Sequence, residues 1–180
     1  MDQQSAVNLS DIYNDWVKFG IMFVVSQLLI GKSLSDPDWR NTTIFLLLGL
    51  AGYHIITKNL INTENFAEYK LVADDLFKFG TMFIIARFIS GQSLLDKQWQ
   101  MSILYIMIGF IIYNILTSQF IQGVQLADTV GLAKTIDDAA KWGTMLIVSQ
   151  LLSGGKISDP AFIRSTLATI AGLSVYNLFS

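Results

Sequence analysis

The sequence predicts an all-α membrane protein with six transmembrane helices, arranged as three parallel two-helix repeats around a pseudo-threefold axis. The first observation behind this prediction is composition: the 180 residues are 52% hydrophobic and 14% charged, with a mean hydropathy of +0.49. The second is that one pattern of two apolar runs occurs three times. The third is that two crossings in each repeat return the chain to its starting side, so the repeats run parallel.

The repeats align without gaps. Residues 15–57 match 75–117 at a shift of 60, and these match 138–180 at a shift of 63, within one membrane domain that spans 1–180. Linkers 58–74 and 118–137 separate them. The residues that all three copies share are Asp15/Asp75/Asp138, Lys18/Lys78/Lys141, Gly20/Gly80/Gly143, Met22/Met82/Met145, Gly31/Gly91/Gly154, Asp36/Asp96/Asp159, Gly49/Gly109/Gly172 and Tyr53/Tyr113/Tyr176. Several are glycines or charged residues, so shared hydrophobicity alone does not explain the match.

Each repeat contains two apolar runs, and their flanks extend them toward the length of a membrane span. The runs are Phe19–Ile30, Thr43–Ile56, Phe79–Ser90, Ile103–Leu116, Trp142–Ser153 and Leu167–Phe179. Runs of this length also occur in soluble proteins, so the alternative is a soluble domain with six core helices. Ile103–Leu116 argues against that alternative, because it lacks the polar face of a soluble helix.

The turn between the two runs of each repeat carries signals for ending one helix and starting the next. A glycine stands where a helix C-cap needs positive φ, and an aspartate stands where the next helix needs an N-cap acceptor. The predicted capping residues are Gly31, Asp36, Gly91, Asp96, Gly154 and Asp159. Both prolines of the chain, Pro37 and Pro160, directly follow such an aspartate, at the first helical position. We therefore assign these aspartates to capping in preference to ion binding.

A long polar side chain occupies the same place in the first helix of every repeat, as Gln27, Arg87 and Gln150. If these side chains faced the axis, they would form a polar ring with one cation, which could bind or pass a small anion. The alternative is that each reaches the nearby turn or headgroups, because it lies four residues before the turn glycine.

A second polar level is predicted near the opposite ends of the helices. Its members are Lys18, Tyr53, His54, Lys78, Tyr113, Asn114, Lys141, Tyr176 and Asn177. Asparagine replaces His54 in two repeats, which favours an interhelical hydrogen bond over a metal ligand. Gly20, Gly49 and their counterparts are predicted to allow close helix approach, and the shared methionines to fill the core.

The sequence offers no catalytic, cofactor-binding or metal-binding residues, so we expect no enzyme and no cofactor. Nucleotide-binding, zinc-protease and serine-hydrolase motifs do not occur. A net charge of −2 and the lack of a Lys/Arg-rich run argue against nucleic-acid binding. The face with the termini and linkers carries six Lys/Arg residues and the face with the turns carries five, which leaves the membrane orientation open.

Two phrases of the sequence carry a resemblance to a known class of proteins. They are Lys78-Phe79-Gly80-Thr81-Met82 leading to Ser90-Gly91, Leu94, Asp96 and Trp99, and Lys141-Trp142-Gly143-Thr144-Met145 leading to Ser153-Gly154 and Asp159. The chain resembles small triplicated membrane proteins of large icosahedral double-stranded DNA viruses, over all three repeats.

This resemblance implies a structural protein of the virion's internal membrane, beneath the capsid shell. It also implies that the protein lies in a host membrane during assembly. It also implies a minor capsid role, in which the turns or linkers contact other membrane or capsid proteins. Homo- or hetero-oligomers are compatible with this role. The alternative function is a small channel or transporter with a pore on the pseudo-threefold axis.

Overall fold

The computed structural model describes residues 9–57, 69–117 and 132–179, and these residues are almost entirely helical. The elements are α1 (Leu9–Leu29), α2 (Pro37–Gly52) with the π-helical turn η1 (Tyr53–Thr57), α4 (Lys70–Ile89), α5 (Lys97–Ile112) with the π-helical turn η3 (Tyr113–Thr117), α7 (Leu132–Leu152) and α8 (Pro160–Phe179). The predicted all-α class and helical bundle are confirmed for this part of the chain. The predicted linkers fall largely outside the described residues.

The three hairpin turns have the same local structure. Gly31, Gly91 and Gly154 have φ angles of 76°, 70° and 79°, the left-handed conformation predicted for them. Their N–H groups and those of the next residues bond back to the last helical turn, which gives a Schellman C-cap. The aspartates at the N-caps accept from backbone N–H groups, with distances of 2.9 Å for Asp36 and Asp159 and 2.8 Å for Asp96.

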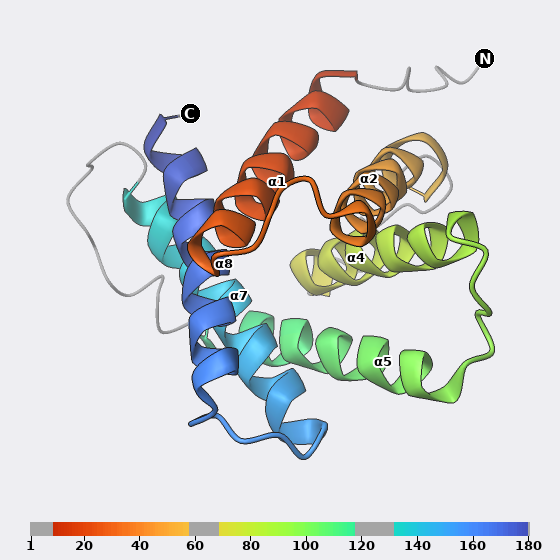
Figure 1. Ribbon diagram of the computed structural model, residues 1–180. Coiled ribbons are helices and arrows are strands. Elements are labelled where there is room, and N and C mark those ends of the chain that lie inside the picture. The colour runs from red at the N-terminus through yellow and green to blue at the C-terminus, as the bar shows by residue number, and fades with distance from the viewer. Residues whose placement is uncertain (1–8, 58–68, 118–131, 180) are drawn as a thin grey trace.

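Helices of different repeats form the closest pairs. α2 packs on α4, α5 packs on α7, and α8 packs on α1. Figure 1 shows the resulting arrangement of hairpins from red, through green, to blue. The second helix of each repeat therefore contacts the first helix of the next, and the last repeat closes back onto the first.

A glycine in each second helix permits this pairing. A Cβ atom added at Gly109 would lie 2.6 Å from Met145 Cα, and one added at Gly172 would lie 2.7 Å from the Met22 carbonyl oxygen. Gly49 approaches the backbone of Met82 in the same way. These backbones touch because no side chain intervenes.

The glycines of the first helices have a different environment from the predicted one. A Cβ atom at Gly20 or Gly80 would meet no heavy atom within 4 Å, and one at Gly143 would meet only a side-chain atom at 3.8 Å. The prediction of close helix approach was therefore wrong for this set, because spacing alone does not show which face of a helix meets a neighbour.

The core is small and is built from equivalent residues of the three repeats. Phe19, Phe79 and Trp142 form a triangle of rings whose centroids lie 5.5 to 5.8 Å apart. The three shared methionines, each 2% exposed, pack in the same cluster. Leu50, Phe110 and Leu173 complete it. This cluster brings together all six helices.

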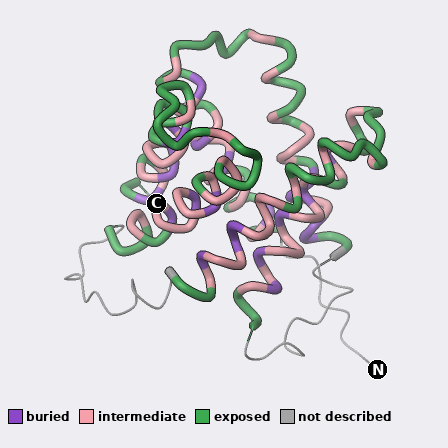
Figure 2. The backbone as a smooth tube through the Cα atoms, turned by 90° about the horizontal axis from the view of Figure 1, so that it is seen from below, coloured by how far each residue is buried: buried purple, intermediate pink, exposed green. Residues whose placement is uncertain are grey.

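The outside of the bundle is rich in apolar side chains. Buried residues lie where helices face one another, and exposed residues surround them (Figure 2). Six positions are both apolar and exposed in every repeat. They are Val24/Ile84/Ile147, Leu28/Phe88/Leu151, Leu29/Ile89/Leu152, Ile44/Leu104/Leu167, Ile55/Ile115/Leu178 and Ile56/Leu116/Phe179, which we call the outer apolar belt.

Of the described helices, one is long and apolar enough to cross a membrane when judged by length and composition. It covers Lys97–Leu116, and 17% of its apolar window is buried inside the protein. The other five predicted spans do not meet this criterion within the described residues. The helical architecture is thus established, whereas the six crossings remain a prediction.

Candidate functional site: a ring of paired charges

Three lysine–aspartate pairs join the repeats in the first halves of α1, α4 and α7. Each lysine bonds the aspartate of the preceding repeat, with Nζ to carboxylate distances of 2.7 to 3.0 Å. The pairs are Lys78 with Asp15, Lys141 with Asp75, and Lys18 with Asp138. They follow the same cyclic order as the helix pairs, so they close a ring of six charges.

A second donor reaches each carboxylate from the other helix of its own repeat. Asn114 and Asn177 donate from Nδ2 to Asp75 and Asp138 at 2.9 and 2.7 Å. His54 Nε2 lies 2.7 Å from Asp15 Oδ2. Because an ionised carboxylate only accepts, this contact places a hydrogen on Nε2. Each aspartate therefore ties three helices of two adjacent repeats together.

The shared tyrosines lie beside this ring, and their environments differ between repeats. The Tyr113 hydroxyl donates to Asp137 of the next repeat. Tyr53 is buried in the corresponding place of the first repeat. In the third repeat, the residue that corresponds to Asp137 across the Tyr176 junction is Asn14 in the sequence. The tyrosine level is thus less symmetric than the lysine–aspartate ring.

The ring includes residues of the polar level that the sequence predicts, and it also includes three aspartates that were not among the predicted site residues. The site residues expected from sequence include the lysines, tyrosines and His54/Asn114/Asn177, and not Asp15, Asp75 or Asp138. The available signal was the identical spacing of aspartate and lysine in all three repeats, three residues apart and therefore on one helix face.

The chemistry of the ring is suited to holding the three repeats together through paired charges. The aspartate side chains are 12 to 14% exposed and the lysine side chains 21 to 26%, so the charges are largely withdrawn from solvent. Buried charges are tolerated when they are paired and hydrogen-bonded, and leaving one unpaired is costly. Since each carboxylate already holds a lysine and a second donor, the arrangement favours holding the repeats together over proton transfer.

The centre of the bundle beside the ring is closed by side chains. The aromatic triangle of Phe19, Phe79 and Trp142 comes one residue after each ring lysine, and Lys78 Nζ lies 5.6 Å from the Phe19 centroid. Rings at these spacings are in van der Waals contact. A water-wide passage on the axis would require them to separate.

The long polar side chains within the first helices serve the hairpin turns. Gln27 Nε2, Arg87 Nε and Gln150 Nε2 donate to the backbone carbonyls of Ser33, Ser93 and Lys156 at 3.1 to 3.2 Å. Each bond spans six residues within one hairpin. The suggested polar ring is therefore not formed. Each residue bonds to its own turn, because it lies only four residues before the glycine that reverses the chain.

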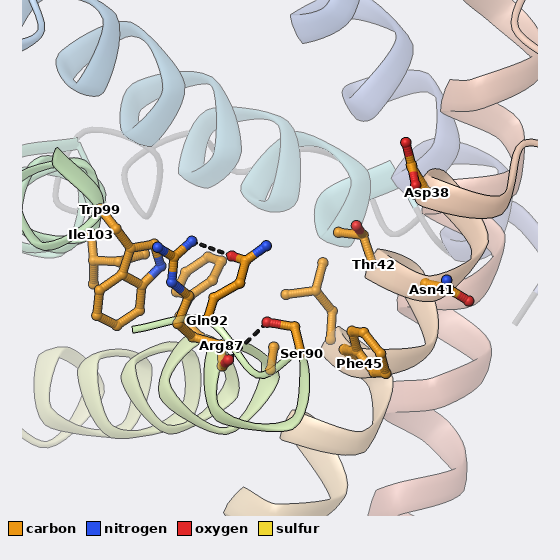
Figure 3. A pocket seen from close by; sticks show the side chains of 12 residues that line it. Asp38, Asn41, Thr42, Phe45, Arg87, Ser90, Gln92, Trp99 and Ile103 are labelled. Carbon is orange, nitrogen blue, oxygen red and sulfur yellow. Dashed lines mark hydrogen bonds between the residues drawn. The ribbon is translucent and has the colours of Figure 1, made fainter. Parts of the chain in front are cut away.

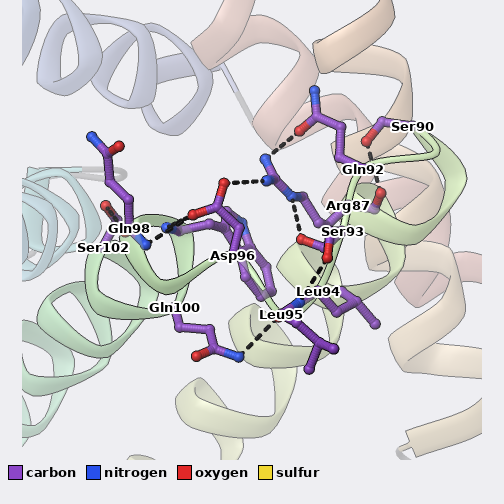
Figure 4. Close-up of polar contacts among 11 residues, drawn as sticks. Arg87, Ser90, Gln92, Ser93, Leu94, Leu95, Asp96, Gln98, Gln100 and Ser102 are labelled. Atoms are coloured by element: carbon purple, nitrogen blue, oxygen red, sulfur yellow. Dashed lines mark hydrogen bonds and ion pairs between the residues drawn. The ribbon is translucent and has the colours of Figure 1, made fainter.

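Arg87 makes additional contacts that the two glutamines do not. Its Nη2 lies 3.1 Å from Asp96 Oδ2, and its Nη1 donates to the Gln92 side chain (Figure 4). Its guanidinium also lies 5.5 Å from the centroid of Trp99. The middle turn thus has an ion pair in addition to the common cap.

Acid should weaken the cap of the middle turn. The Trp99 and Gln98 backbone N–H groups, followed by the Arg87 charge, hold the pKa of the Asp96 carboxyl below its ordinary value. A lowered folded-state pKa gives a stability contribution that is complete above the unfolded value of about 4 and is lost as pH falls through the folded value. After correction for intrinsic exchange, amide protection of Gln98 and Trp99 should stay constant from pH 7 to about 5 and decline only in stronger acid. Protection that already declines between pH 7 and 5 would contradict this assignment.

A cavity of about 650 Å³ lies between the first two repeats near the same turn. Its lining includes Asp38, Asn41 and Thr42 from α2, and Arg87 and Gln92 across from them (Figure 3). Phe45, Leu46, Phe83, Trp99 and Ile103 supply apolar walls. The sequence patterns did not reveal this cavity.

Comparison with known proteins adds no relative: the chain matches no protein-family model, no curated protein and no solved structure.

Proposed function

We propose that the chain is a non-enzymatic structural membrane protein that crosses the bilayer six times. The observation that carries this proposal is the outer apolar belt, in which the same six positions of each repeat are apolar and between 37% and 88% exposed. Apolar patches this extensive are rare on soluble proteins and are typical of a surface covered by lipid or protein.

The length of the exposed apolar surface also suits a bilayer. On α1 the exposed apolar side chains run from Leu9 to Leu29, 76% and 51% exposed, with exposed Ser10 and Asn14 between them. A helix rises 1.5 Å per residue, so this surface extends about 30 Å, close to the thickness of the hydrocarbon core. The helix over Lys97–Leu116 supports the same conclusion, because it is strongly apolar yet mostly unburied within the protein.

The ring of paired charges accounts for the lower hydropathy of α1, α4 and α7, the first helix of each repeat. α4, for example, carries Asp75 and Lys78, and both are paired with charges of neighbouring repeats. A count of charged residues treats these groups as exposed to lipid, although they face the inside of the bundle. Charged groups within membranes are tolerated when they pair with one another in this way.

The ring also alters the charge balance that predicts membrane orientation. Lys18, Lys78 and Lys141 belong to the ring, so they are not available as flanking charges. Three positive residues then remain on the linker face: Lys70, Lys134 and Lys58, the last of which is outside the described residues. The turn face carries five, namely Lys32, Arg40, Lys97, Lys156 and Arg164. Because the turn face carries five positive residues and the linker face three, the positive-inside rule favours the turns on the cytoplasmic side.

Cysteine labelling tests both the crossings and their direction. The chain has no cysteine, so single cysteines can be placed at Lys32, Lys97 and Lys156, with Leu9 and Lys134 as positions on the opposite face. A membrane-impermeant maleimide should label all three turns from the cytoplasmic side, and Leu9 and Lys134 from the other. Turns that label from different sides would contradict three parallel hairpins.

The proposed cellular role is attachment of a viral internal membrane to the overlying capsid shell. The resemblance to triplicated viral membrane proteins motivates this role, and a closed ring of hairpins suits it, because three turns are presented together on one side. The aromatic triangle weighs against the alternative of an axial channel.

Cross-linking in purified virus particles tests this role. A photo-reactive amino acid at Lys32, Lys97 or Lys156, and in the linkers, should capture a capsid or membrane protein from one of the two faces. The same substitution at Leu104 in the outer apolar belt provides the lipid-facing control. Absence of the chain from purified particles, with full recovery in host membranes, would exclude the virion role.

A further inference from the structure

The cavity between the first two repeats has an apolar part and a charged part, which suits an amphiphilic ligand. Phe45, Leu46, Phe83 and Ile103 form its apolar part, while Asp38 and Arg87 supply opposite charges from α2 and α4 (Figure 3). Its volume of about 650 Å³ is within the range of about 300 to 1,000 Å³ that is typical of sites for small organic ligands.

The cavity exists where the repeats differ. Asn41 lines it, and the equivalent residue of the third repeat is Arg164. Arg164 Nη2 reaches across the corresponding junction to the Leu29 carbonyl at 3.3 Å, next to Gly31. At the junction between the first two repeats, the equivalent backbone carbonyl is that of Ile89. The short side chain of Asn41 therefore leaves space that an arginine occupies elsewhere in the molecule.

The charged groups of the cavity are held in position. Arg87 donates to Ser93, Gln92 and Asp96 and stacks near Trp99, which fixes the plane of its guanidinium. A guanidinium has five N–H donors, and these contacts use three, so two are left for an anionic ligand. Asp38 on the opposite wall offers a carboxylate to a cationic group.

We propose that this cavity binds one zwitterionic phospholipid from the surrounding bilayer. Arg87 contacts the phosphate, Asp38 contacts the ammonium group, and one acyl chain lies against Phe45, Phe83 and Ile103. The inference rests on the proposed membrane function, since the cavity is at the hairpin-turn end of the helices, where headgroups would be found. The opposed charges select a zwitterionic headgroup over an anionic one.

Native mass spectrometry of the purified full chain tests this proposal. The protein is reconstituted in nanodiscs of equal phosphatidylcholine and phosphatidylglycerol and then released into detergent. The wild type should retain about one phosphatidylcholine. Asn41→Arg should reduce its retention at least tenfold, because the new side chain fills the cavity as Arg164 does at its own junction. Met101→Arg, at the equivalent position of the remaining junction, should retain lipid like the wild type.

A second variant tests the headgroup contact. Arg87→Gln preserves the turn, because Gln27 and Gln150 make the same bond to a turn carbonyl. It should weaken phosphatidylcholine retention about tenfold, as expected for loss of a charge-assisted hydrogen bond. Equal retention by wild type and Asn41→Arg, preference for phosphatidylglycerol, or no retained lipid would overturn the proposal. If the cysteine labelling shows six crossings and no lipid is retained, only this inference fails and the membrane function stands.

Discussion

Replacing Asp75 with alanine is expected to lower the free energy of unfolding by about 3 kcal/mol, the largest effect we predict for a single side chain. The substitution leaves Lys141 and Asn114 without the carboxylate that both contact. Lys141 is 21% exposed, so partial solvation places the cost at the lower end of the range for broken buried ion pairs. Unfolding by SDS in mixed micelles, followed by circular dichroism, measures the change.

Two comparisons separate the ring from a general loss of charge. Adding Lys141→Met to Asp75→Ala should recover part of the loss, because no lysine then lacks a partner. Asp38→Ala, at an exposed position away from the ring, should cost less than about 1 kcal/mol. Asp15→Ala and Asp138→Ala should resemble Asp75→Ala if the three repeats contribute equally. An additive double variant would show that the pair is not coupled.

The second large effect is expected from Gly109→Ala, which should destabilise the protein by about 2 kcal/mol. The new methyl group would overlap the backbone of Met145, and it can be accommodated only if α5 and α7 move apart. Gly49→Ala and Gly172→Ala act on the two other junctions and should have similar costs. The same SDS titration measures all three variants.

Gly80→Ala is the matched control for this prediction. Gly80 is also a helical glycine shared by the repeats, but a Cβ atom there meets nothing within 4 Å. Alanine should leave stability unchanged or raise it by up to about 1 kcal/mol, since it favours the helix over the unfolded chain. Similar destabilisation at both positions would mean that glycine matters for a reason other than the backbone contact.

Local features of the fold were predictable from the sequence. The turn glycines and N-cap aspartates act within a few residues of the chain, so their spacing is sufficient to assign them. The six helices of the described residues correspond to the six apolar runs of the sequence. The cyclic pairing of each second helix with the next repeat was not predictable, because the pattern is compatible with any closed arrangement of three hairpins.

The site was predictable only in part for a related reason. Sequence spacing gives the height of a side chain along its helix but not the direction in which it points. Lys18 and Asn114 were therefore assigned to a common polar level. Gln27 and Arg87 were considered as side chains that face the pseudo-threefold axis, although they bond to their own turns. Asp75 was noted as a shared residue, but its role depends on contacts with Lys141, 66 positions away.

In the proposed membrane protein, the outer apolar belt faces lipid in all three repeats. Spin labels at the equivalent positions Ile44, Leu104 and Leu167, which are 51%, 48% and 61% exposed, test it most directly in reconstituted bilayers. We expect high accessibility to molecular oxygen and low accessibility to a water-soluble nickel chelate at all three. High accessibility to the chelate at these positions would show that the belt faces water and would contradict the proposed membrane protein.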